Sequence, residues 1–169
     1  MKLVSINIDN LTECHDINEN NIPEVGSKSL SEFKSIVANS DFNLCISIDE
    51  VTVGFVICFK DSQSTHKYLL ELGHKNYQQC KQRLDDFLYI DRIAVHKSFR
   101  NKKIASRLYD EVLKFAKKNA ITHLTAEINL LPSKNIPSFL FHEKYKFTEL
   151  DTVKYSKDYE VSLQVRMNS

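Results

Sequence analysis

A strand, a basic loop, an amphipathic helix and a second strand follow one another between residues 87 and 130, and this order restricts the fold most. Phe87 to Val95 is a run of β-formers that is nearly all apolar, which predicts a strand covered on both faces. From Ile104 to Ala120 apolar residues recur at helical spacing, and Leu124 to Leu130 is again strand-like. A strand, helix and strand in this order predict a right-handed crossover that joins two parallel strands.

The segments on either side predict further strands and helices, and hence a mixed α/β sheet. The expected strands cover Leu3 to Ile8, Phe42 to Asp49, Val51 to Phe59 and Tyr159 to Met167, with the middle two forming a hairpin. The expected helices cover Leu11 to Asn20, Ser29 to Asn39 with Ser29 as its cap before Glu32, and Pro137 to Lys144. The polar stretch 61–85 is too long for a structureless connection, so part of it should be helical and form a lid or flap.

Composition favours a cytoplasmic protein with one domain. The length is 169 residues, and a net charge of +1 supplies no strong attraction to nucleic acid or anionic lipid. No apolar run approaches the ~20 residues that cross a bilayer, and no export signal is visible at the start. The four cysteines, which lack the spacing of a redox pair or a zinc site, are expected to be reduced thiols: Cys14, Cys45, Cys58 and Cys80.

The basic loop that follows Val95 has the composition of an anion site. The first amides of a helix have no partner within the helix and lie at the positive end of its dipole. N–H groups near Lys102 to Ala105 can therefore hold phosphate oxygens. The basic side chains that add positive charge are Lys97, Arg100, Lys102 and Lys103. Basic loops are also ordinary solvated surface, so the loop alone leaves both interpretations open.

Three segments that cover roughly residues 87 to 150 occur in a distinctive order. They are "YIDRIAV" leading into "RNKKIA" and the helix "SRLYDEVLKFAKK", then the strand "LTAEINL", then "NIPSFLFHEKYKF". The first resembles the diphosphate loop, Arg/Gln-x-x-Gly-x-Gly/Ala, of the GNAT superfamily of acetyl-coenzyme A-dependent N-acetyltransferases. The third is similar to that family's Asn-x-x-Ser/Ala-x-x-Phe-Tyr-x-x-x-Gly-Phe helix and turn. More narrowly, "NENNIPEVGS" and "FLYIDRIAV" resemble a bacterial branch of predicted acetyltransferases.

This resemblance implies one GNAT domain over residues 1–169, with a mixed, mostly antiparallel twisted sheet and helices on both faces. A central parallel strand pair would be splayed to hold the cofactor, acetyl-coenzyme A. The implied activity is that of an N-acetyltransferase, which moves acetyl to an amine of a small molecule or peptide by direct attack in a ternary complex, without a metal. We expect no bulk nucleic acid or membrane partner, and a monomer or homodimer. A non-catalytic acyl-coenzyme A-binding sensor and a structural interaction domain stay open as alternatives.

The resemblance also assigns cofactor-binding residues. Backbone groups at the end of the central strand would pair with pantetheine, the loop would hold the diphosphate, and the last motif would contact the cofactor's arm. In that order the residues are Ile93, Ala94, Val95, Arg100, Asn101, Lys102, Lys103, Ile104, Ala105, Ser106, Asn135, Ser138 and Phe141. Two lysines stand where the family has glycine. A positive φ at Lys103 would cost about 1 kcal/mol, and Lys146 should end its helix in a left-handed conformation.

Two carboxylates are candidates for the general base that takes a proton from the attacking amine. Asp91 lies on the central strand and Glu127 on the neighbouring one. The alternative for both carboxylates is a structural role, in a pair with Arg92 or as the cap of a loop. The candidates for acceptor contacts are Tyr89 beside Asp91, Asn129 on the face of Glu127, and Asn21 and Ser27 from a loop that in the family borders the acceptor pocket.

The departing thiolate needs a proton or must leave unaided. Many family members have a tyrosine where this chain has His142, so histidine is one candidate donor. Tyr145, one helical turn later, is the other, although it is also a candidate for the core. A thiol with a pKa near ~8.5 also leaves fairly well without an acid. A backbone N–H near Val95 would stabilise the oxyanion.

Overall fold

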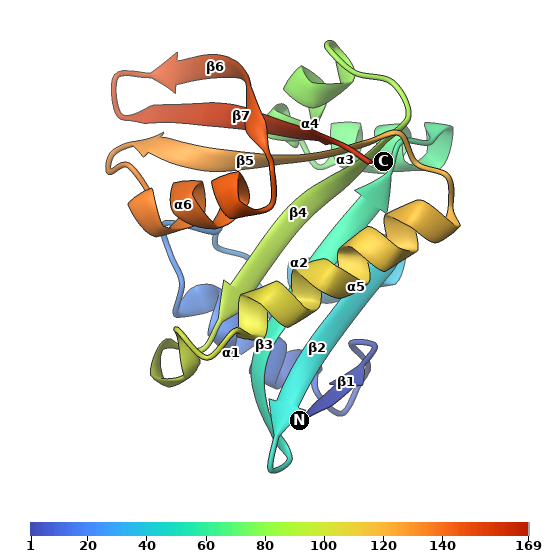
Figure 1. Cartoon of the computed structure of the whole chain (residues 1–169), viewed down its shortest axis with the longest axis vertical. Helices are drawn as coiled ribbons and strands as arrows, with labels where there is room; N and C mark the ends of the chain where they lie inside the picture. Colours follow the sequence, from blue (N-terminus) through green and yellow to red (C-terminus); the bar gives the residue numbers. More distant parts are fainter. Residues whose placement is uncertain (169) are drawn as a thin grey trace. The chain divides into compact units, whose positions relative to one another are not determined.

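A computed structural model describes residues 1–168, which form two compact units (Figure 1). The first unit holds residues 1–59 and 90–115, and the second holds residues 60–89 and the chain from 116 onward. The seven strands follow the sheet order β1-β2-β3-β4-β5-β7-β6. Strands β4 and β5 are parallel, whereas the pairs β1–β2, β2–β3, β5–β7 and β6–β7 are antiparallel. The predicted mixed, mostly antiparallel α/β sheet with one parallel pair is confirmed.

The elements of the first unit are β1 (Lys2–Val4), α1 (Leu11–Glu19), α2 (Leu30–Asn39), β2 (Phe42–Ile48), β3 (Val51–Lys60), the end of β4 (Phe87–Val95), a 3-10 helix (Lys97–Phe99) and most of α5 (Ile104–Lys118). Those of the second are α3 (Gln63–Glu71), α4 (Lys75–Lys81), the start of β4, β5 (His123–Leu131), α6 (Ile136–Lys144), β6 (Thr148–Ser156) and β7 (Tyr159–Met167). The predicted helical content of residues 61–85 is therefore confirmed. Within residues 1–168 no helix is long and apolar enough to span a bilayer.

Local sequence signals set several element ends in the first unit. The predicted cap of α2 is present, since Glu32 N donates to Ser29 Oγ and Ser29 N donates to Glu32 Oε2. The β2–β3 turn places two consecutive residues, 49 and 50, at positive φ, as a two-residue hairpin turn requires. Strand β1 is shorter than predicted because Ile6 N donates to the side chain of Asn43, at 2.8 Å, instead of continuing the strand pairing.

Strand β3 lies in the core of the first unit. Every side chain from Thr52 to Phe59 is buried, so both faces of this strand are covered. Phe55 packs edge to face on Phe33 of α2, with ring centroids 5.4 Å apart. The four cysteines are buried and free, as predicted for reduced thiols.

Helices α4 and α6 cover opposite faces of the sheet in the second unit (Figure 1). On one face, Cys80 Sγ of α4 lies 3.3 Å from Thr125 Oγ1 of β5. On the other, Arg166 pairs with Leu124 across the sheet and donates to Tyr145 O at the end of α6, at 3.0 Å. Because side chains alternate along a strand, Glu127 lies on the same face of β5 as Thr125, which is the face of α4.

Candidate active site

The basic loop of the first unit enters α5 through a tight, exposed turn. Asn101 and Lys103 both have positive φ, 61° and 60°, so Lys103 adopts the left-handed conformation that favours glycine. Arg107 N donates to Lys103 O at 3.0 Å, so the first hydrogen bond of α5 starts at this lysine. The first amides of the helix therefore lie at an exposed turn, where the helix dipole favours an anion.

Gly54 of β3, which is not among the residues predicted from the sequence, allows the close packing behind this turn. A β-carbon at this position would lie 2.8 Å from Ile104 Cγ2 and 3.1 Å from Ala94 O. Next to it, His96 N donates to Val53 O at 2.8 Å. The glycine thus lets β3 approach both the end of β4 and the start of α5. A glycine inside a run of strand residues is the signal that marks such a site.

The basic side chains of the loop are held in different ways. Arg100 donates from Nη2 to Asn21 Oδ1 at 2.7 Å, and Lys102 Nζ lies 4.7 Å from the centre of the Phe99 ring. Lys103 is exposed. The loop therefore offers positive charge, while the arginine is tied to the segment between α1 and α2.

The two residues predicted from that segment to contact the acceptor make bonds within the first unit. Asn21 donates from Nδ2 to Ile17 O at 2.7 Å and to Val95 O at 3.3 Å. Ser27 donates to Glu19 Oε2 at 2.7 Å. These bonds order the segment on the end of β4 and give both side chains a structural role. Their contact with an acceptor stays a prediction.

Asp91 forms a buried ion pair with its neighbour, the alternative that the sequence left open. Asp91 Oδ2 accepts from Arg92 Nε at 2.7 Å, and the side chains of Arg92 and Asp91 are only 4% and 1% exposed, respectively. Arg92 Nη1 also donates to Asn18 Oδ1 at 3.0 Å and to Gly26 O at 3.3 Å. The pair therefore connects β4 to α1 and to the segment that follows it.

Glu127 belongs to the second unit and is accessible to solvent in part. Its Oε2 accepts a hydrogen bond of 2.7 Å from the hydroxyl of Tyr89, which is buried. Tyr89 is opposite Thr125 in the parallel pairing of β4 with β5, and Asn129 follows Glu127 on the same strand. The structure thus brings Tyr89 and Glu127 together, as a carboxylate and a hydroxyl that orients it.

His142 is buried in the second unit, packed between aromatic rings. Its side chain lies edge to face with Phe141 and Phe147, and Nδ1 lies 2.8 Å from Ser138 O. Burial lowers the pKa of His142 to about 4, against a smaller opposing effect of the bond to Ser138. The ring is therefore neutral at pH 7. Asn135 of the same motif, predicted to contact the cofactor's arm, caps α6 by accepting from Ser138 N at 3.2 Å.

The end of α6 has the conformation predicted from the lysine at a glycine position. Lys146 has a φ of 62°, its N–H donates to Glu143 O, and Phe147 N donates to His142 O. This is the paired ending that follows a left-handed residue. Tyr145 is half-buried, and its ring centre lies 5.0 Å from that of Phe141.

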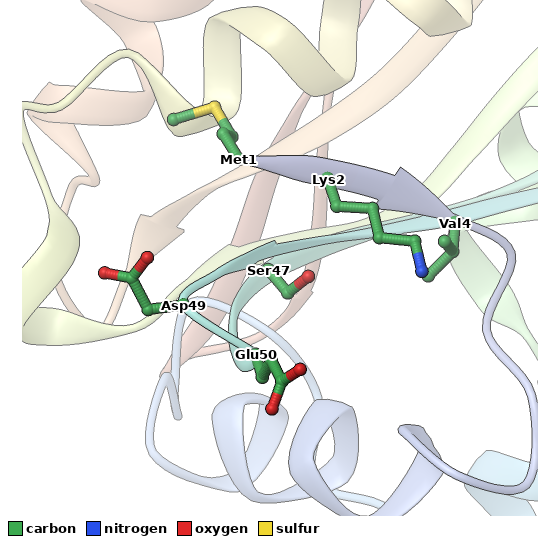
Figure 2. A pocket seen from close by; sticks show the side chains of 6 residues that line it. All are labelled: Met1, Lys2, Val4, Ser47, Asp49 and Glu50. Carbon is green, nitrogen blue, oxygen red and sulfur yellow. The ribbon is translucent and has the colours of Figure 1, made fainter.

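A separate cavity of about 320 Å³ opens beside β1 and the β2–β3 turn (Figure 2). Its lining residues are Met1, Lys2, Val4, Ser47, Asp49 and Glu50. None of them is among the predicted site residues. Across residues 1–168, the acidic, cysteine and histidine side chains form no group of three that could hold a metal ion.

The model of the Acetyltransferase (GNAT) family matches residues 11–147. No curated protein matches the chain.

Several solved structures share the fold. Ard1 from Thermoplasma volcanium has a TM-score of 0.78 and 14% identity, with 99% of this chain and 97% of that one covered. The ribosomal-protein-S18-alanine N-acetyltransferase from Escherichia coli has a TM-score of 0.74 and 13% identity, over 99% and 94%. An aminoglycoside 6'-N-acetyltransferase complexed with coenzyme A has a TM-score of 0.75 and 12% identity, over 100% and 98%. At these identities the likeness shows the fold.

Proposed function

Because the chain belongs to the GNAT family of acetyltransferases, we propose that it transfers acetyl from acetyl-coenzyme A to an amine of a small molecule or peptide, by direct attack in a ternary complex. The observation that carries this proposal is the turn at residues 100–105, an exposed turn that leads into α5 after the end of β4 and the short 3-10 helix. The family match includes residues of both units, which supports one acetyltransferase domain. The four free thiols are compatible with a cytoplasmic location.

The residues of the turn fit a diphosphate. Backbone amides from Arg100 to Ala105, together with Ser106, would hold its oxygens, and the close approach that Gly54 permits would keep the turn in place. Main-chain groups of Ile93 to Val95 would pair with the pantetheine arm. In the second unit, Asn135, Ser138 and Phe141 would contact the arm. The bound thioester supplies an activated acetyl group.

Glu127 is the general base that we favour. An amine with a pKa near ~10 is mostly protonated at pH 7, so a carboxylate must accept its proton before nitrogen attacks the acetyl carbon. Glu127 is half-buried and hydrogen-bonded to Tyr89, whereas Asp91 is buried in a pair with Arg92. A partly solvated carboxylate that a hydroxyl orders suits proton transfer, while the ion pair suits stability. A backbone N–H near Val95 would stabilise the oxyanion.

We assign no proton-donor role to His142, since the neutral buried ring is bonded to Ser138 O. Tyr145 stays a candidate donor. A thiol with a pKa near ~8.5 also departs without one. The same neutral histidine favours the alternative function, an acyl-coenzyme A sensor without turnover, because many family members have a tyrosine at this motif position.

An assay of thiol release separates these functions. Purified protein is mixed with acetyl-coenzyme A, with and without a panel of primary amines, while calorimetry measures cofactor binding. Amine-dependent thiol release with an acetylated product supports the transferase. Binding without release for any amine supports the sensor, and absence of binding contradicts both.

A further inference from the structure

Two tyrosines near the β6–β7 turn are fixed together by a residue of α4. Asn76 donates from Nδ2 to Tyr159 Oη at 3.1 Å, and Tyr155 Oη donates to Asn76 Oδ1 at 2.8 Å. The two rings stack, with centroids 5.1 Å apart and planes 22° apart. Asn76 is buried, so one amide with both hydrogen-bonding functions satisfied sets the orientation of both rings.

These rings lie on the face of the sheet that also carries Glu127. Asn129 pairs with Val161 across β5 and β7, and Tyr159 is two residues before Val161, on the same face. Tyr155 is the extra residue of an irregularity in the β6–β7 pairing, and its bond to Asn76 turns its ring onto Tyr159. Tyr89 completes the set through its bond to Glu127. We call Tyr89, Tyr155, Tyr159 and Asn76 the tyrosine shell.

The negative charge of Glu127 acts on the ionisation of both stacked tyrosines. Burial raises the pKa of Tyr155 and of Tyr159, and the negative charge of Glu127 raises both further. The phenols therefore stay uncharged. Tyr159 is 36% exposed and Glu127 is half-buried, so part of this face is open to solvent.

Aromatic ring faces and a carboxylate attract the same kind of ligand. The π-face of a phenol is negative and binds ammonium groups, and a carboxylate adds direct attraction. Lys75 already shows this preference, since its ammonium lies 5.7 Å from the centre of the Tyr155 ring. The other cations on α4 or just beyond it are already paired with carboxylates: Lys81 with Asp61 at 3.0 Å and Asp85 at 2.9 Å, and Arg83 with Asp151 at 2.6 Å. The negative charge of Glu127 repels any carboxylate on the incoming molecule.

We propose that the tyrosine shell and Glu127 bind a cationic amine that has no carboxylate next to its reacting nitrogen. This inference rests on the acetyltransferase function proposed above and names the substrate class of that site. Tyr155 and Tyr159 contact the acceptor, and Asn76 is a positioning residue that acts through them. The ammonium gives one proton to Glu127, and the neutral nitrogen then attacks the acetyl carbon. As the carbon–sulfur bond of the thioester breaks, the second proton of this nitrogen passes to the departing thiolate, which leaves as the thiol of coenzyme A.

The first test compares acceptors that differ by one carboxylate. The pairs are tyramine with tyrosine, putrescine with ornithine, and agmatine with arginine. The wild-type protein should show a kcat/KM about tenfold to a hundredfold higher for the amine without the carboxylate, because like charges repel at the site. Equal or higher kcat/KM for the amino acids overturns the proposal.

The second test removes one ring at a time. Tyr159→Leu should raise the KM for the best amine by about threefold to thirtyfold, whereas Tyr159→Phe, which keeps the ring, should raise it less. Asn76→Ala should also raise the amine KM. The KM for acetyl-coenzyme A should stay unchanged in all three. An amine KM that does not change in Tyr159→Leu contradicts a role of the ring in binding.

The outcomes distinguish the two proposals. If no amine promotes thiol release by the wild-type protein, the transferase function itself fails. If amines are acetylated but the amino acids react equally well, the function stands and the substrate class is wrong. The acceptor comparison uses only wild-type protein, so it decides the matter even if a tyrosine variant does not fold.

Discussion

The turn at residues 100–105 and the tyrosine shell differ in how they are built. The turn consists of consecutive residues in the first unit, and its proposed ligands are main-chain amides. The shell consists of side chains in the second unit, and the hydrogen bond between Asn76 and Tyr159 joins residues 83 positions apart. A main-chain site tolerates changes of side chain, whereas a side-chain site does not. Substitutions in and around the turn should therefore mainly lower the stability of the protein, whereas substitutions in and around the tyrosine shell should mainly lower its activity.

The largest effect is expected at Glu127. Glu127→Gln removes the proposed base but keeps the size of the side chain, so kcat should fall by about 10²–10⁴-fold while the KM for acetyl-coenzyme A changes little. Steady-state kinetics measure this, with Glu143→Gln, an exposed carboxylate of α6, as the control. Unchanged kcat in Glu127→Gln would mean that this carboxylate is not the base.

Asp91→Asn should act on stability instead. It leaves Arg92 without its charged partner in a buried position, and breaking such a pair costs about 3–5 kcal/mol. Denaturant unfolding at neutral pH measures the loss. Where the variant is folded, its kcat should stay within a few-fold of wild type, and a loss as large as that of Glu127→Gln would show that Asp91 takes part in catalysis.

His142 should make stability depend on pH. Its pKa is about 4 in the folded protein and 6.5 in a free side chain, so the unfolded chain binds the extra proton first as pH falls. Stability is unaffected above pH 6.5 and falls between pH 6.5 and 4, by about 3 kcal/mol in total from this group. His142→Gln should lose less stability than wild type over this range. Parallel curves for the two proteins would contradict the burial effect.

Gly54→Ala should destabilise the turn that holds the proposed diphosphate site. The new methyl group would meet Ile104 and the carbonyl of Ala94, and such overpacking costs about 1–3 kcal/mol. Gly26→Ala is the matched control, because a β-carbon there meets nothing within 4 Å. In Gly54→Ala the melting temperature should fall and the KM for acetyl-coenzyme A should rise. Neither quantity should change in Gly26→Ala.

The smallest effect is expected at Lys103. Lys103→Gly relieves a positive φ and should stabilise the protein by about 1 kcal/mol, while the amide that it contributes stays in place. Lys102→Gly, at a residue without positive φ, should not gain stability. A large rise in the KM for acetyl-coenzyme A in Lys103→Gly would mean that the ammonium, not the amide, is the main ligand.

The sequence predicted best what depends on neighbouring residues. The α2 cap at Ser29 and the crossover around the basic loop each follow from residues that are close in sequence, whereas the left-handed Lys146 follows from the glycine that the similar family has at this position. The cap and the crossover are set by local conformational preferences and by hydrophobic periodicity. The composition of the basic loop leaves both an anion site and solvated surface open, so the diphosphate turn is predicted from the resemblance to the family and not from its own residues alone.

Long-range contacts could not be predicted in this way. The bond between Arg100 and Asn21 and the shell around Asn76 join segments that are distant in sequence, so periodicity carries no sign of them. Strand β6 is not among the predicted strands, because its side chains are exposed or half-buried and alternate weakly. Asp91 could be either a base or an ion-pair partner until the position of Arg92 was known.

The most direct test of the diphosphate turn follows the main-chain amides of residues 100–105 by NMR during titration with coenzyme A. We expect saturable shifts of these amide resonances with coenzyme A, and much smaller ones with acetylpantetheine, which has no diphosphate. Binding of coenzyme A that leaves these amides unchanged would contradict the role of this turn.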